Sequence, residues 1–144
     1  MHKSSAIRAI LFLCATAILP VEAMAADQQQ STGWADAHEI LRLSRQMKAK
    51  GLMPVKIECK EDSSSSFIRD SILVNITFAP DTNHLPWKWV WGTNMGHFEH
   101  YLAPKGWKLV SKSGFTRPKT GLFVPCGIFV GPPGTSALYG PPTH

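Results

Sequence analysis

The sequence predicts an α+β protein with an antiparallel sheet of about four to five strands, in the order α-β-β-(β)-α-β-β. One long and one short helix are expected to pack on one face of this sheet. Two observations predict the class. A segment with helical periodicity comes before segments in which apolar and polar residues alternate, and a second, shorter helical segment comes before a second hairpin. Runs of consecutive strands interrupted by single helices are typical of α+β proteins.

The long helix is expected over residues 34–50. Ser31 or Thr32 stands where an N-cap belongs, and Gly51 follows the last turn as a C-terminal stop. The apolar stripe at helical spacing consists of Ile40, Leu41, Leu43 and Met47.

Two strands are expected after the long helix, at residues 52–61 and 67–78. In the first, Val55, Ile57 and Cys59 alternate with charged residues, which indicates a strand with one buried face. The second has a nearly continuous apolar centre, which is typical of a strand in the middle of a sheet.

Residues 86–92 contain three of the five tryptophans, at every second position. In a strand, successive side chains point to opposite faces, so Trp87, Trp89 and Trp91 share one face and Lys88 takes the other. This pattern has two interpretations: the indoles are the centre of a small core, or they form a platform for a ligand.

A short helix over residues 95–102 and a hairpin of strands at 107–115 and 122–130 complete the expected domain. The candidate core residues of this hairpin are Val110, Phe123, Val124, Ile128 and Phe129. Lys50-Gly51 before the first hairpin is echoed by Lys105-Gly106 before the second, which suggests a helix–strand–strand unit used twice.

Residues 1–25 have the features of a cleaved secretory signal peptide. Lys3 and Arg8 give a positively charged start, and Ala25 is the small residue at the expected cleavage site. The apolar run between them, residues 9–19, is shorter than the roughly 20 residues that span a bilayer. A lipoprotein modified at Cys14 is disfavoured because a large leucine precedes the cysteine. We therefore expect a periplasmic or secreted protein with no transmembrane segment in the mature chain.

The exported chain is expected to have three parts. Residues 26–33 form a flexible leader, residues 34–131 a single globular α+β domain, and residues 132–144 a disordered tail rich in Pro and Gly.

Removal of the signal peptide leaves two cysteines, Cys59 and Cys126. An even number of cysteines in an exported chain predicts a disulfide, here with a single connectivity. The alternatives are free thiols or metal ligands, and the absence of a C-x-x-C pair disfavours zinc.

Residues 26–144 contain 13 Lys and Arg and 9 Asp and Glu, so the mature chain is mildly basic. An anionic or saccharide cell-wall polymer, or an envelope protein, is a suitable partner, although a solvated surface explains the same charge. Nucleic acid is excluded as a partner because the chain is exported and only weakly basic.

The leading functional hypothesis is a small exported binding module of the cell envelope that recognises a protein or a cell-wall saccharide. Its ligand-binding residues are expected to be Trp87, Trp89, Trp91 and Lys88, because aromatic faces stack on sugar rings and on planar groups.

The alternative from another class is a metal-dependent hydrolase that uses His84, His97 and His100. His97 and His100 share a helix face at a spacing of three residues, but the spacing differs from H-E-x-x-H. The chain also has no G-x-S-x-G elbow, so enzyme status is less favoured and no cofactor is expected. A third hypothesis is a structural accessory subunit whose tryptophan face is covered by a partner.

Overall fold

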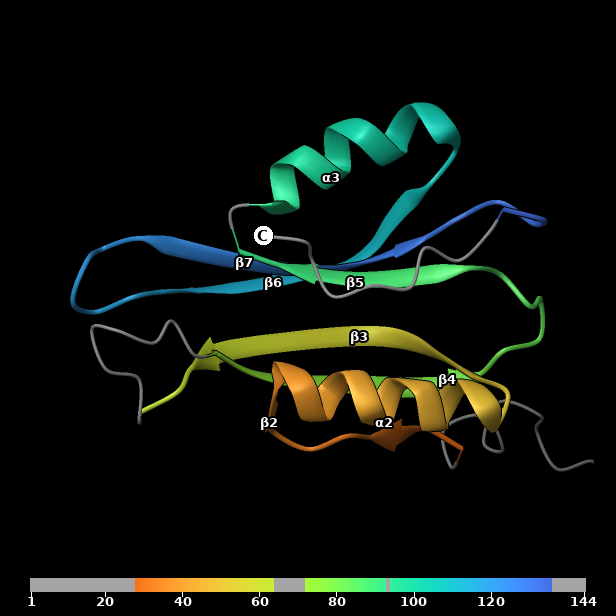
Figure 1. Cartoon of the computed structure of the whole chain (residues 1–144), viewed down its shortest axis with the longest axis horizontal. Coiled ribbons are helices and arrows are strands. Elements are labelled where there is room, and N and C mark those ends of the chain that lie inside the picture. The colour runs from red at the N-terminus through yellow and green to blue at the C-terminus, as the bar shows by residue number, and fades with distance from the viewer. Residues whose placement is uncertain (1–27, 64–71, 93, 136–144) are drawn as a thin grey trace, which may run out of the picture.

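The computed structural model describes residues 28–63, 72–92 and 94–135 (Figure 1). The signal peptide expected at residues 1–25 and most of the expected tail lie outside these ranges. The described elements, in chain order, are β1 (Gln30–Ser31), β2 (Ala35–Asp36), α2 (Ala37–Ala49), β3 (Leu52–Glu61), β4 (Ile72–Pro80), β5 (Trp87–Trp91), α3 (Asn94–Leu102), the 3-10 helix η1 (Ala103–Lys105), β6 (Lys108–Thr116) and β7 (Phe123–Val130). The α+β class is confirmed.

The strands form two antiparallel sheets where the sequence predicted one. In the first sheet, β4 lies between β3 on one side and the short β1 and β2 on the other, so its central position is confirmed. The second sheet has the order β5-β7-β6. Among the residues that the structure describes, no backbone ladder joins β3 to β6, although the two strands are neighbours. At the described contact the Ile57 N–H donates to the Ser111 hydroxyl at 3.1 Å, so a side chain bridges the sheets.

The strands β3 and β6 run in the same direction. Ile57 lies beside Ser111, and two residues further along β3 Cys59 is bonded to Cys126, which is paired with Ser113 of β6. Both strands therefore advance together, as Figure 1 also shows.

The long helix starts later than expected, because the residues before it belong to a strand. Ala35–Asp36 pairs with β4, and the Asp36 carboxylate then caps α2 by accepting from the Glu39 N–H at 2.9 Å. The expectations of a start at residue 34 and a cap at Ser31 or Thr32 were wrong. Gln30–Ser31 also pairs with β4, so this part of the expected flexible leader is a strand.

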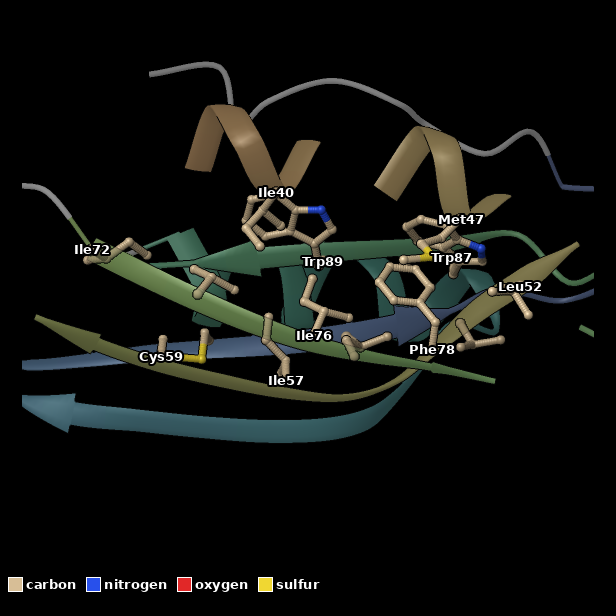
Figure 2. Packing of buried hydrophobic residues seen from close by; sticks show 14 of the residues in the cluster. Ile40, Met47, Leu52, Ile57, Cys59, Ile72, Ile76, Phe78, Trp87 and Trp89 are labelled. Atoms are coloured by element: carbon tan, nitrogen blue, oxygen red, sulfur yellow. A yellow bond between two sulfur atoms is a disulfide. The ribbon is translucent and has the colours of Figure 1, made fainter. Parts of the chain in front are cut away.

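The two helices pack in different hydrophobic clusters. Ile40 and Met47 of α2 lie with Trp87 and Trp89 in the main core (Figure 2). The α3 helix packs in a second cluster made of Val90, Met95, Leu102, Trp107 and Phe129.

Trp89 and Val90 are consecutive strand residues, so they point to opposite faces of the second sheet. We call the face with Trp89 the inner face and the face with Val90, beneath α3, the outer face. The helices thus lie on opposite faces, where the sequence predicted one face.

The two halves of the chain repeat one unit of strand, helix, strand and strand. The pairs from Met53↔Ala79 to Glu61↔Ile72 match the pairs from Lys108↔Val130 to Thr116↔Phe123, and both hairpins have a bulge at the third position. In each half the leading strand pairs with the last one, as β1 and β2 do with β4 and β5 does with β7.

Glycines at the same place in both units allow the turn from helix to strand. Gly51 and Gly106 have φ of 73° and 80°, a region that L residues with a side chain rarely adopt. The repeat suggested by the sequence is therefore present, and it includes a leading strand that the sequence pattern did not reveal.

Candidate binding surface

Two of the three tryptophans of β5 belong to the core. Trp87 and Trp89 are 3 % and 9 % exposed, and the Trp87 ring meets the Phe78 ring edge to face with centroids 6.0 Å apart. Figure 2 shows both indoles on the side of Ile40 and Met47. Trp91 is half-buried against the same cluster. Of the two interpretations of the tryptophan pattern, the structure supports the core.

Lys88 lies on the opposite face of β5 from these indoles and reaches the outer surface. Its Nζ atom is 4.3 Å from the centroid of the Phe98 ring of α3, which is a cation–π contact. Desolvation by burial lowers the pKa of Lys88. Of the four residues expected to bind a ligand, Lys88 is the one that the structure places on the outer face.

The three candidate metal ligands are all exposed. His84 lies in the loop before β5 with a φ of 51°, and its N–H donates to the Asp81 carboxylate at 2.7 Å. His97 and His100 lie on α3. Within the described ranges, no three His, Cys, Asp or Glu side chains gather to hold a metal ion. The His97 ring instead stacks on Tyr101 with centroids 6.3 Å apart.

Cys59 and Cys126 form the predicted disulfide, with their Cα atoms 6.5 Å apart. It joins β3 of the first sheet to β7 of the second. The two cysteines are 6 % and 0 % exposed, so the bond lies within the main core. This prediction is confirmed, and the bond takes the place of a backbone ladder as a direct link between the sheets.

The exposed side of α3 and η1 has an aromatic and basic stripe. His97, Tyr101 and Lys105 follow at intervals of four residues, so they share one side of the helix. Tyr101 is 48 % exposed, and the Lys105 Nζ lies 3.5 Å from its ring centroid. Lys105 lowers the pKa of Tyr101, chiefly by a side-chain hydrogen bond and then by its charge. A cation held on an aromatic ring suits carboxylate ligands with an apolar part.

The β6–β7 hairpin displays a second aromatic residue on the outer face. Phe123 was expected in the core, but it is 56 % exposed. Its ring lies over Gly114, where an added Cβ would come within 2.4 Å of the Phe123 Cζ atom. Val110 was also expected in the core, but as the bulge residue of β6 it is 50 % exposed. The strand pattern alone did not separate these two residues from buried neighbours.

The net positive charge of residues 26–144 comes from one half of this range. Residues 26–81 contain seven Lys and Arg and eight Asp and Glu, whereas residues 82–144 contain six and one. We call these ranges the first and second halves. The net charge of the whole chain conceals this difference, and a count by halves would have revealed it. The second half includes α3, β5 and the β6–β7 hairpin, so the stripe and Phe123 lie in the basic half.

Comparison with protein-family models, curated proteins and solved structures finds no match to this chain. Among the described residues, no helix is long and apolar enough to cross a membrane.

Proposed function

We propose that this protein is an exported binding module of the cell envelope, periplasmic or secreted, that binds an acidic protein through the outer face of its second half. The observation that carries the proposal is the charge of this half, which has five Lys and one Glu besides the buried Arg117 that pairs with Glu61, together with the exposed aromatic side chains Tyr101 and Phe123. Complementary charge steers partners together and suppresses wrong ones.

Export is supported by two features of the sequence and one of the fold. Residues 1–25 have the composition of a signal peptide, and the two remaining cysteines are paired as they are in an oxidising compartment. The disulfide lies in the core of a domain that repeats one small unit, so it stabilises the contact between the two units.

A protein partner is favoured over a saccharide by the kind of aromatic residue on the surface. Trp87 and Trp89, the indoles best suited to stack on sugars, are buried. Tyr101 and Phe123 are exposed instead, and Tyr101 lies against Lys105. Aromatic residues with a polar rim are typical of protein interfaces. The tryptophan-rich strand contributes to the proposed surface indirectly. Its inner-face indoles fix the position of β5, and its outer face carries Lys88.

The test uses poly-L-glutamate as an acidic polypeptide probe and measures its affinity by fluorescence anisotropy. A variant with Lys105→Gln and Lys112→Gln removes two charges from the second half. The control, with Lys50→Gln and Lys60→Gln, removes two charges from the first half; all four lysines are exposed, and Lys60 lies on the Trp34 ring as Lys105 lies on the Tyr101 ring. Each exposed charge pair contributes at most about 1 kcal/mol, so we expect the first variant to bind about tenfold more weakly. The control should retain most of the affinity, and added salt should weaken binding to the wild type.

Equal losses in both variants would contradict the proposal, because they would show that only net charge matters. Tighter binding of polygalacturonate, a carboxylated saccharide, than of poly-L-glutamate would replace the protein partner with a cell-wall saccharide.

A further inference from the structure

The internal repeat gives every paired residue of β6 and β7 a counterpart in the first hairpin. The last paired positions are Glu61↔Ile72 and Thr116↔Phe123, so Phe123 is the counterpart of Ile72. Ile72 is 2 % exposed and Phe123 is 56 % exposed. The same position of the repeated unit is thus buried in the first half and exposed in the second.

The difference arises from what lies over each position. Ile72 belongs to the main core, together with Ile40 of α2 and Trp89, which the other sheet contributes (Figure 2). On the outer face of the second half, α3 covers a shorter stretch of sheet. Met95 reaches Gly127, where an added Cβ would lie 2.3 Å from the Met95 Cε atom. Within the described chain, the cluster beneath α3 does not include Phe123.

The part of the outer face that α3 does not cover has apolar residues, with a lysine beside them. Gly114 is paired with Pro125, and the Phe123 ring lies over Gly114, so the three share the outer face. We call Gly114, Phe123 and Pro125 the apolar seat. Lys112 is paired with Gly127, which faces Met95, so Lys112 stands on the same face two residues from Gly114. The seat therefore lies between the covered sheet under α3 and the hairpin turn.

We infer that the apolar seat receives a large apolar side chain of the acidic partner, so the recognised segment combines carboxylates with an exposed aromatic or aliphatic residue. This inference rests on the proposed function and adds the residue that anchors the complex. Anchors of this kind are often aromatic and dominate the affinity of an interface. A second copy of this chain is a poor occupant in a two-fold symmetric dimer through this face, because its own basic half would face Lys112 and the other lysines of the seat's half.

The test compares two probes on the full exported chain, poly-L-glutamate and a random copolymer of glutamate and tyrosine. Stacking and burial of one aromatic ring should make the wild type bind the copolymer about tenfold more tightly than poly-L-glutamate. Phe123→Ser should abolish this preference, so that the variant binds the copolymer and poly-L-glutamate with similar affinity. Phe123→Leu, which keeps an apolar side chain, should retain most of the preference.

Trp34→Ser is the matched control, because Trp34 is an exposed aromatic residue of the first half, 44 % exposed. It should leave the preference for the copolymer intact. Circular dichroism on each variant confirms that the fold is retained before affinities are compared.

The outcomes separate the inference from the proposed function. A copolymer preference that survives Phe123→Ser, with binding to poly-L-glutamate intact, overturns the inference alone. Absence of binding to either polypeptide overturns the proposed function. A dimer in sedimentation experiments that Phe123→Ser dissociates would assign the seat to a second copy and overturn the inference as well.

Discussion

Loss of the disulfide between Cys59 and Cys126 should destabilise the protein more than any single exposed substitution. The bond closes a loop with a sequence separation of 67 residues. In the chain-entropy model, a loop of this length corresponds to about 4 kcal/mol of stability, because the bond restricts the unfolded chain. For the exported chain proposed here, residues 26–144, this corresponds to a fall in the melting temperature of about 15 °C.

Two perturbations separate the contribution of the covalent bond to stability from the contribution of the packing of the two cysteine side chains. Reduction of the wild type with dithiothreitol breaks the bond and keeps both sulfur atoms, whereas the double variant Cys59→Ala/Cys126→Ala also removes buried volume. Urea denaturation followed by fluorescence and circular dichroism gives the free energy of unfolding in each case. We expect the reduced protein to lose about 4 kcal/mol and the double variant somewhat more. A loss below about 1 kcal/mol on reduction would refute the view that this bond, in place of a ladder between β3 and β6, holds the two halves together.

Two further predictions concern aromatic residues. Trp89→Ala should lower the free energy of unfolding by about 3–5 kcal/mol in urea denaturation, because it opens a cavity in the main core, whereas Trp34→Ala should cost less than about 1 kcal/mol; similar costs would place Trp89 at the surface. In ultraviolet titration of a Tyr139→Phe variant, Tyr101 should ionise below the usual range for tyrosine, and Lys105→Met should raise its pKa, because the ammonium group favours the tyrosinate. An unchanged titration would show that Lys105 does not contact the phenol in solution.

The elements that the sequence predicted well are those with a strong local pattern. The alternation over Leu52–Glu61 and the tryptophans of Trp87–Trp91 were sufficient to define β3 and β5. The two-residue strands Gln30–Ser31 and Ala35–Asp36 had no such pattern, because they are defined by pairing with β4. The sequence pattern also did not reveal the division into two sheets, because this division depends on whether β3 and β6 pair through their backbones.

The candidate site was less predictable than the fold. Alternation places Trp87 and Trp89 on one face but does not say whether that face is inside, and the answer depends on α2, which is distant in sequence. Phe123 was expected in the core together with its apolar strand neighbours, and most of these neighbours are buried. Its exposure depends on how far along the sheet α3 extends, and this extent is determined only by the arrangement of the elements in space.

The repeat explains why Phe123 is exposed although its counterpart Ile72 is buried. Phe78 and Phe129 are counterparts, yet Phe78 lies in the main core with α2 and Phe129 lies beneath α3. Equivalent faces of the two units therefore point to opposite sides of the molecule. The sheets close around α2, so the first unit needs only one apolar face, and the other face of its β4 has polar residues such as Asn75 and Thr77.

The second unit has to contact the core with one face and α3 with the other, so β7 is buried on both sides over most of its length. Phe123 stands at the start of this apolar strand, where α3 no longer covers the outer face. Buried apolar surface favours the folded state, whereas the exposed part of the Phe123 ring adds no such stabilisation until a partner covers it. The same half carries the net positive charge. A partner that supplies both carboxylates and an apolar side chain would complete on the outer face the kind of packing that α2 and Trp89 provide on the inner one.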